Sequence, residues 1–164
     1  MVAVHDADRA LLYLDFSDDT GPTVGPAPGT DHWQGLPVIW DDAAVTAVAA
    51  ELAAYFAGDL QRFSVPLAPA GNAFHRTVWT ELTRIPYGET ISYGELARRI
   101  GRPGAARAVG RANGSNPIAV VIPCHRVIGA SGQLTGYSGG IERKRALLAL
   151  EHSTTPLGQG TMGW

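Results

Sequence analysis

Residues 92–127 read SYGELARRIGRPGAARAVGRANGSNPIAVVIPCHRV, and this stretch predicts the most specific structural feature of the chain. Ser92 and Glu95 form the S-x-x-E pattern of a capping box, which marks the first turn of a helix. That helix should end near Gly101, and the Arg-Pro-Gly turn after it leads into a second helix over Ala105–Asn113. Two short helices joined by so tight a turn predict a helix-turn-helix.

A wholly apolar run, Ile118–Ile122, follows this pair of helices and should be buried. The chain then reads Pro123-Cys124-His125-Arg126-Val127, and Cys124 is its only cysteine. A single cysteine forms neither an internal disulfide nor a CxxC zinc site, so it is either an inert buried residue or a reactive group.

The neighbours of Cys124 offer groups that could activate a thiol, but on these residues alone an inert buried cysteine is favoured, because free cysteines are commonly buried. Positive charge and a basic imidazole lower the pKa of a thiol, and Arg126 and His125 offer both. Adjacent side chains of an extended segment point to opposite faces, however, so His125 reaches the sulfur only through a bend or a bridging water. Pro123 favours a bend or the end of a strand, because proline does not continue an interior strand.

Signals of strands and a helix alternate in residues 1–70, which predicts a small α/β domain. The expected elements are a hairpin, a loop rich in Gly and Pro, a third strand, a helix capped by Asp41 or Asp42 and a short extended piece: Val2–His5 with Ala10–Phe16, Ser17–Gly35, Leu36–Trp40, residues 43–57 and Phe63–Leu67. The helix carries an apolar stripe of Val45, Val48, Leu52, Tyr55 and Phe56.

Residues 71–152 are expected to form a mostly helical second domain after a linker at 68–71. A stripe from Phe74 to Ile85 predicts its first helix, and Ile141–Leu150 its last. Residues 153–164 are expected to be a flexible tail.

Charge is distributed unevenly along a chain whose net charge is only -2. Residues 1–60 hold ten acids and one base, a net of -9, whereas residues 61–164 hold five acids and twelve bases, a net of +7. Residues 96–141 contain six arginines and no acid: Arg98, Arg99, Arg102, Arg107, Arg111 and Arg126. This pattern indicates either a face that meets a polyanion or an ordinary solvated face.

The sequence from about Phe74 to Glu151 resembles the 6-O-alkylguanine-DNA alkyltransferase family, also called the methylated-DNA–protein-cysteine methyltransferases. The resemblance rests on motifs in a shared order: the helix-turn-helix with AARAVG at 105–110, SNP at 115–117, IPCHRV at 122–127 and GYSGG at 136–140. A PCHRV pentapeptide among these motifs is highly specific to this family.

The resemblance implies single-turnover, direct-reversal DNA repair, in which an alkyl group moves from 6-O-alkylguanine to Cys124. It implies that His125 is the base that deprotonates the sulfur through a water. Glu151 resembles the carboxylate that orients His125. Asn116 resembles the residue that braces the turn beside the cysteine, and Tyr93 the phenol that donates to the guanine ring.

The resemblance also implies residues that bind DNA. A base inside a duplex is out of reach until it is flipped out, and Arg107 resembles the finger that fills the vacated space. Small neighbours would let this helix approach the minor groove closely. Arg102 and Arg111 would contact phosphates. Ser138 and the bend at Gly139 resemble the loop that closes over the exocyclic oxygen of the guanine, with Tyr137 beside it. The small neighbours are Ala105, Ala106, Ala108 and Gly110.

The implied architecture is a small ribonuclease H-like α/β domain followed by a mostly helical domain with the helix-turn-helix. The implied partner is double-stranded DNA. We expect a monomer with no cofactor and no metal, because a second cysteine for zinc is absent from the sequence. No apolar run approaches the roughly 18 residues of a membrane helix, so a cytoplasmic protein is expected.

Two departures from the family pattern stand out. The front domain looks abbreviated, as though a first strand before Val2 were missing. Ala119 stands where some relatives carry a proline that lines the alkyl pocket, which bears on acceptance of groups as bulky as benzyl.

Three alternatives remain at the level of sequence. A lesion-binding relative that does not repair would lack the acceptor cysteine, which is present here. A helix-turn-helix regulator would read base edges, for which the second helix offers few groups. A cysteine hydrolase would use a Cys/His pair but would turn over repeatedly.

Overall fold

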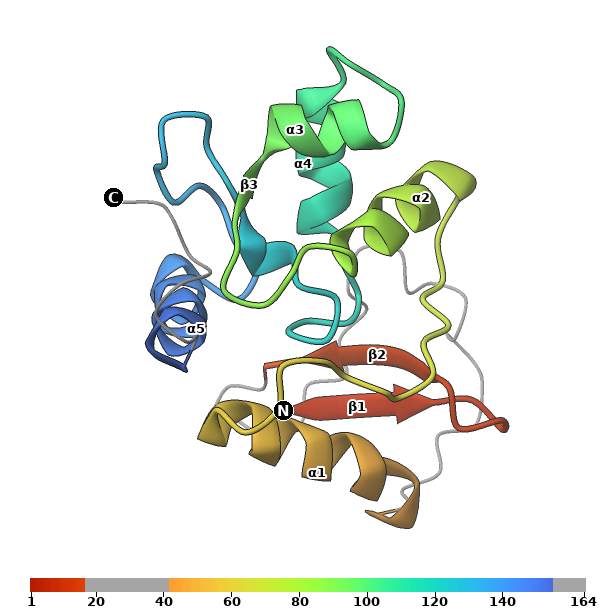
Figure 1. Ribbon diagram of the computed structural model, residues 1–164. Helices are drawn as coiled ribbons and strands as arrows, with labels where there is room; N and C mark the ends of the chain where they lie inside the picture. The colour runs from red at the N-terminus through yellow and green to blue at the C-terminus, as the bar shows by residue number, and fades with distance from the viewer. Residues whose placement is uncertain (17–41, 155–164) are drawn as a thin grey trace.

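A computed structural model describes residues 1–16 and 42–154 of the chain. Strands β1 (Val2–His5) and β2 (Leu11–Asp15) pair antiparallel, which confirms the predicted hairpin. Figure 1 shows this hairpin between one helix on one side and a group of helices on the other. The expected loop at 17–35, the strand at 36–40, the capping Asp41 and the tail from 155 lie outside the described residues.

Helix α1 (Asp42–Ala57) packs beside the hairpin. Its buried residues Val48, Leu52 and Tyr55 follow the predicted stripe, because residues three and four apart share one helix face. Phe56 was expected in that stripe and is instead 45% exposed, since it lies one position round the helix from Tyr55.

The second edge of β2 joins the hairpin to distant parts of the chain. Leu11 N donates to Pro66 O (2.7 Å), and Leu14 N donates to Pro117 O (2.9 Å). Ala119 N in turn donates to Leu14 O (2.7 Å). The hairpin is therefore hydrogen bonded directly to the apolar segment that leads to Cys124, and the buried core runs without interruption across the expected boundary at residue 70.

Helices α2 (Ala73–Leu82), α3 (Tyr93–Arg99) and α4 (Ala106–Gly114) form the group on the other side of the hairpin (Figure 1). The Ser92 side chain accepts from Glu95 N (3.1 Å), as the capping box predicts. At the other end of α3, Arg102 N donates to Ala97 O (2.9 Å) and Gly101 adopts φ +70°. This is a Schellman ending, and it turns the chain into α4.

The segment between α4 and the last helix is irregular. Val121 N donates to Ala119 O (2.8 Å) across Val120, whose φ of +69° is strained for a β-branched residue. Cys124–Arg126 form a 3-10 turn, and β4 (Val127–Ile128) pairs parallel with β3 (Ile91–Ser92). The sequence did not predict this small sheet.

Helix α5 (Ile141–Thr154) extends four residues beyond its expected end at Leu150, so the start of the expected tail is helical. Within residues 1–16 and 42–154, none of the helices has the length and apolar character that crossing a membrane requires.

Candidate active site

Cys124 is buried, with 3% of its surface exposed, at the start of the 3-10 turn that follows Pro123. The bend expected at Pro123 is therefore present. The Asn116 amide Nδ2 lies 3.1 Å from Cys124 Sγ and also donates to Ile122 O (2.8 Å). Its Oδ1 accepts from Ile118 N (3.0 Å), so Asn116 ties the strained turn to the sulfur.

The resting sulfur is a thiol. Burial raises the pKa of Cys124 to about 11, although the Asn116 hydrogen bond and the charge of Lys144 oppose the rise. The expectation that Arg126 and His125 would lower this pKa is wrong, because burial disfavours the anion more than its neighbours favour it. The thiolate must therefore form during a reaction rather than before it.

His125 and Glu151 form a fully buried pair. His125 Nε2 lies 2.9 Å from Glu151 Oε1, and neither side chain is exposed. Burial lowers the pKa of His125, although Glu151 opposes this, so the imidazole is neutral at pH 7. With Nε2 donating to the carboxylate, Nδ1 carries the free lone pair, and this buried atom has no hydrogen-bond partner among the described residues. The arrangement can accept a proton at Nδ1.

Arg126 also belongs to this buried cluster and not to a charged surface. Its Nε and Nη2 donate to Glu151 (2.9–3.2 Å), and its Nη1 donates to Ile85 O (2.6 Å). Burial alone would raise the pKa of Glu151, but the hydrogen bonds from His125 and Arg126 outweigh it and lower the value to about 2. The carboxylate is thus ionised throughout the physiological range.

Lys144 is a buried cation that sequence reasoning missed. Its Nζ donates to Val127 O (2.6 Å) and to Thr135 O (3.1 Å). Burial lowers its pKa to about 8, and the attraction of Cys124 opposes this shift. A signal was present: residues 144, 147, 148 and 151 fall on one face of α5, and all are buried.

The residues expected around the base lie on two elements beside this cluster. Thr135 Oγ1 donates to the Tyr93 hydroxyl (3.3 Å), while Tyr137 is buried and its hydroxyl has no partner among the described residues. A Cβ at Gly139 would lie 2.8 Å from the Tyr137 ring and 3.0 Å from the Phe16 ring, so only glycine fits there. Ser138 is exposed on the same loop.

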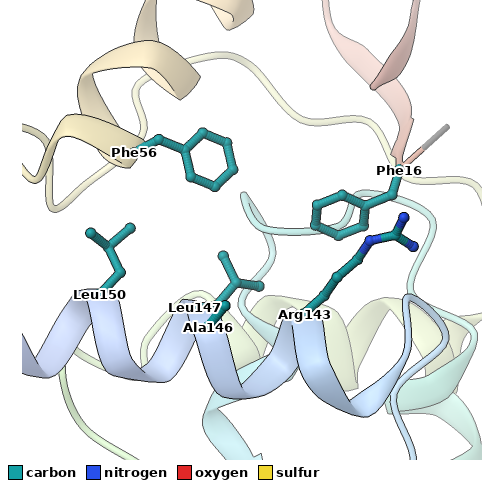
Figure 2. A pocket seen from close by; sticks show the side chains of 6 residues that line it. All are labelled: Phe16, Phe56, Arg143, Ala146, Leu147 and Leu150. Carbon is teal, nitrogen blue, oxygen red and sulfur yellow. The ribbon is translucent and has the colours of Figure 1, made fainter. Parts of the chain in front are cut away.

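A cavity of about 140 Å³ lies between Phe16, Phe56 and one face of α5, where Arg143 also lines it (Figure 2). Cys124 is not among its lining residues, so this cavity is not the way to the sulfur. Arg143 stacks on the Phe16 ring (4.9 Å to its centroid), and its Nη1 donates to Gly139 O (3.1 Å). The end of β2 therefore supports the Gly139 loop.

The residues expected to contact DNA lie on α4 and on the turn before it. Arg102, Arg107 and Arg111 are exposed. The Ala and Gly residues between them are partly exposed, and Gly110 packs against the Tyr93 ring (3.7 Å from its Cβ position): Ala105, Ala106, Ala108 and Gly110. Within residues 1–16 and 42–154, no cluster of three or more His, Cys, Asp or Glu could hold a metal ion.

Known proteins are similar to this chain in both sequence and fold. The family model described as 6-O-methylguanine DNA methyltransferase, DNA binding domain, matches residues 73–153. The methylated-DNA–protein-cysteine methyltransferase of Mycobacterium tuberculosis (strain ATCC 25618 / H37Rv) is 58% identical over 129 residues, which are 79% of this chain and 75% of that protein. The chain belongs to this methyltransferase family.

Other members of the methylated-DNA–protein-cysteine methyltransferase family are also similar to this chain. The protein of Methanosarcina acetivorans is 59% identical over 103 residues, or 63% of this chain and 66% of its own. A crystal structure of the M. tuberculosis O6-methylguanine methyltransferase has 52% identity and a TM-score of 0.76 over 91% of this chain and 84% of that one. The M. tuberculosis OGT in complex with DNA has 63% identity and a TM-score of 0.66, over 68% of each chain.

Proposed function

We propose that this protein repairs DNA by direct reversal, transferring an alkyl group from 6-O-alkylguanine to Cys124 once per molecule. One observation supports the proposal most directly. A buried thiol is followed in sequence by a buried, neutral imidazole whose Nε2 is held by the Glu151 carboxylate, in a chain of this family. The resulting thioether has no leaving group, so each molecule reacts once.

The proton and electron balance follows from the cluster. The Cys124 proton moves to Nδ1 of His125, directly or through one water, while Glu151 stabilises the imidazolium through Nε2. The sulfur forms a bond to the alkyl carbon, the bond from that carbon to the guanine oxygen breaks, and its electron pair passes into the guanine. The imidazolium proton returns to the guanine ring through solvent, so thiol and 6-O-alkylguanine become thioether and guanine.

The base site in this proposal lies between α3 and the Gly139 loop. Tyr93 accepts from Thr135, which leaves its phenol proton free to donate to the guanine as negative charge develops. Tyr137, whose buried hydroxyl has no hydrogen-bond partner within residues 1–16 and 42–154, would lie against the base, and Ser138 with Gly139 would close over the guanine oxygen. Because Cys124 is only 3% exposed, the flipped base must enter this site for the reaction to occur.

The DNA interface in this proposal is α4 with the turn before it, as a helix-turn-helix that enters the minor groove. Small residues along α4 permit close approach, and Arg107, the second residue of α4, is exposed and able to fill the space left by a flipped base. Arg102 and Arg111 flank it and would contact phosphates. Binding as a monomer, a ribonuclease H-like N-terminal domain (residues 1–70), a second domain over 71–152 and a cytoplasmic location belong to the same proposal.

One experiment tests the reaction. The protein is mixed with a duplex carrying 6-O-methylguanine, and its peptides are weighed by mass spectrometry. We expect one added methyl group per molecule on the peptide that carries Cys124, and no transfer by Cys124→Ala, which should still bind DNA. A methyl group on another peptide, or repeated turnover, would contradict the proposal. Binding by the native protein without any transfer would indicate the lesion-binding alternative.

A further inference from the structure

Tyr55 places a hydroxyl of the N-terminal segment (residues 1–70) on the buried carboxylate of the candidate active site. Tyr55 lies on α1, has no exposed surface and donates to Glu151 Oε1 at 2.6 Å, across 96 residues of chain. Its ring packs against Phe63 (5.3 Å between centroids) and Tyr87 (5.9 Å). The apolar stripe of α1 predicts a buried ring at this position, but packing alone does not require the hydroxyl.

The Tyr55 hydroxyl and the His125 imidazole share one acceptor atom. Both lie within hydrogen-bond distance of Glu151 Oε1, at 2.6 and 2.9 Å. Arg126 reaches both carboxylate oxygens, and Gly88 N donates to Oε2 (3.1 Å). Each added donor withdraws electron density from Oε1, and a poorer acceptor there stabilises the doubly protonated imidazolium less.

We propose that Tyr55 is a positioning residue that tunes His125: by occupying Glu151 Oε1, its hydroxyl keeps the imidazole neutral and ready to accept a proton. The proposal rests on the proposed alkyl transfer, in which His125 is the base. It gives the N-terminal segment a chemical role in the buried cluster of His125, Arg126 and Glu151.

The other titratable and charged groups around the pair come from several elements. Arg126, on the 3-10 turn, binds the carboxylate, and Lys144, two turns before Glu151 on α5, also disfavours a charged imidazole. Tyr87, after α2, lies under the Arg126 guanidinium (5.6 Å) and beside Tyr55. The Cys124 thiol precedes His125 directly. Among these groups, Tyr55 alone belongs to the N-terminal segment.

The direction of the effect follows from the shared oxygen. In Tyr55→Phe, Oε1 loses a donor and interacts more strongly with the proton on His125 Nε2, so the pKa of His125 rises. A protonated imidazole cannot accept the Cys124 proton, so the transfer rate falls as the pH drops below the pKa of His125. This fall, the acid limb of the pH–rate profile, therefore moves to higher pH in the variant. The expected displacement is about 0.5 to 1 pH unit, since only part of a hydrogen bond to a charged group is passed on.

Tyr87→Phe is the matched control. It removes a phenol hydroxyl from the same aromatic cluster, but this hydroxyl bonds to Thr154 Oγ1 (2.6 Å) and not to the carboxylate. Single-turnover methyl transfer from a 6-O-methylguanine duplex is measured from pH 5 to 8.5 for the native protein and both variants. An acid limb displaced upward in Tyr55→Phe alone supports the proposal. Displacement in both variants, in neither, or toward lower pH overturns it.

A second measurement separates this proposal from the proposed function. The pKa of His125 is determined by NMR titration of its ring in the native protein and both variants, with no DNA present. A higher pKa in Tyr55→Phe than in the other two proteins supports the tuning role even if no alkyl transfer is found. The same His125 pKa in all three proteins would contradict the proposed role of Tyr55, whether or not alkyl transfer occurs.

Discussion

At the scale of single residues, the sulfur of Cys124 has to lose its proton where burial favours the thiol. Lys144 is a buried cation whose charge opposes that effect, and its Nζ also holds two backbone carbonyls in place. In Lys144→Met, the pKa of Cys124 should rise above about 11 and methyl transfer at pH 7.5 should slow by about tenfold for each unit of the rise.

The rate of single-turnover transfer checks this prediction. Arg145→Met is the control, because Arg145 is the next residue, lies on the exposed side of α5 and pairs with Glu142. It removes one positive charge without changing the sulfur's surroundings, so its rate should equal the native one. Equal rates for both variants would show that the charge of Lys144 does not reach Cys124.

At the scale of elements, the Schellman ending of α3 sets the direction in which α4 leaves. Gly101 has φ +70° and its Cβ position faces open space, so alanine there would be strained without any clash. Gly101→Ala should lower the free energy of unfolding by about 1 to 2 kcal/mol. Gly114→Ala is the control: Gly114 is the last residue of α4 and its Cβ position is also open, so the change should be neutral or stabilising by up to about 1 kcal/mol. Urea unfolding measures both, and similar values for the two variants would contradict the role of the left-handed turn.

The helices and strands also differ in how well they could be predicted from the sequence. The hairpin, α3 with its capping serine and α4 were predicted because local signals determine them: alternation, a capping box and glycine punctuation. The β3–β4 pairing was missed because two-residue strands have no periodicity and their partners lie 36 positions apart. At the site, the motif predicted that His125 and Glu151 interact, and the two side chains lie 2.9 Å apart. The sequence predicted a lowered pKa for Cys124, whereas burial raises it. Tyr55 was assigned to the core because a helical stripe predicts burial of a ring and not the partner of its hydroxyl.

The proposed role of α4 makes a prediction at the same scale. Arg107 is exposed, and the proposal gives it a task only in duplex DNA, where a flipped base leaves a gap. Arg107→Ala should therefore slow methyl transfer from a duplex by about tenfold or more, the equivalent of roughly 1.4 kcal/mol, and leave the reaction with the free 6-O-methylguanine base unchanged. Arg84→Ala, which removes an exposed arginine after α2, should change neither rate. Equal losses with duplex and free base would count against the finger role.

At the scale of the whole molecule, the buried cluster couples stability to pH. The pKa of Glu151 is about 2 in the folded protein against its usual 4.5, so its stabilising effect is present above pH 4.5 and is lost as the pH falls toward 2. His125 has a folded pKa below 6.5, so the unfolded chain takes up a proton first and stability falls as the pH drops below 6.5. The two effects have the same sign, and acid should weaken the fold in two steps.

Urea unfolding of the native protein between pH 7 and 3 should show this decline, with Glu151 contributing about 3 kcal/mol at neutral pH. Glu151→Gln should flatten the part below pH 4.5 and, because it leaves the buried Arg126 charge without its partner, lower the free energy of unfolding at pH 7 by about 3 to 5 kcal/mol. Glu142→Gln removes an acid that is 83% exposed on the same helix, and its curve should follow the native one within about 0.5 kcal/mol. If the Glu151→Gln curve ran parallel to the native one down to pH 3, the carboxylate would not be the group that links folding to acid. The low pKa assigned to Glu151 would then have to be abandoned, and with it the account of how the carboxylate holds His125.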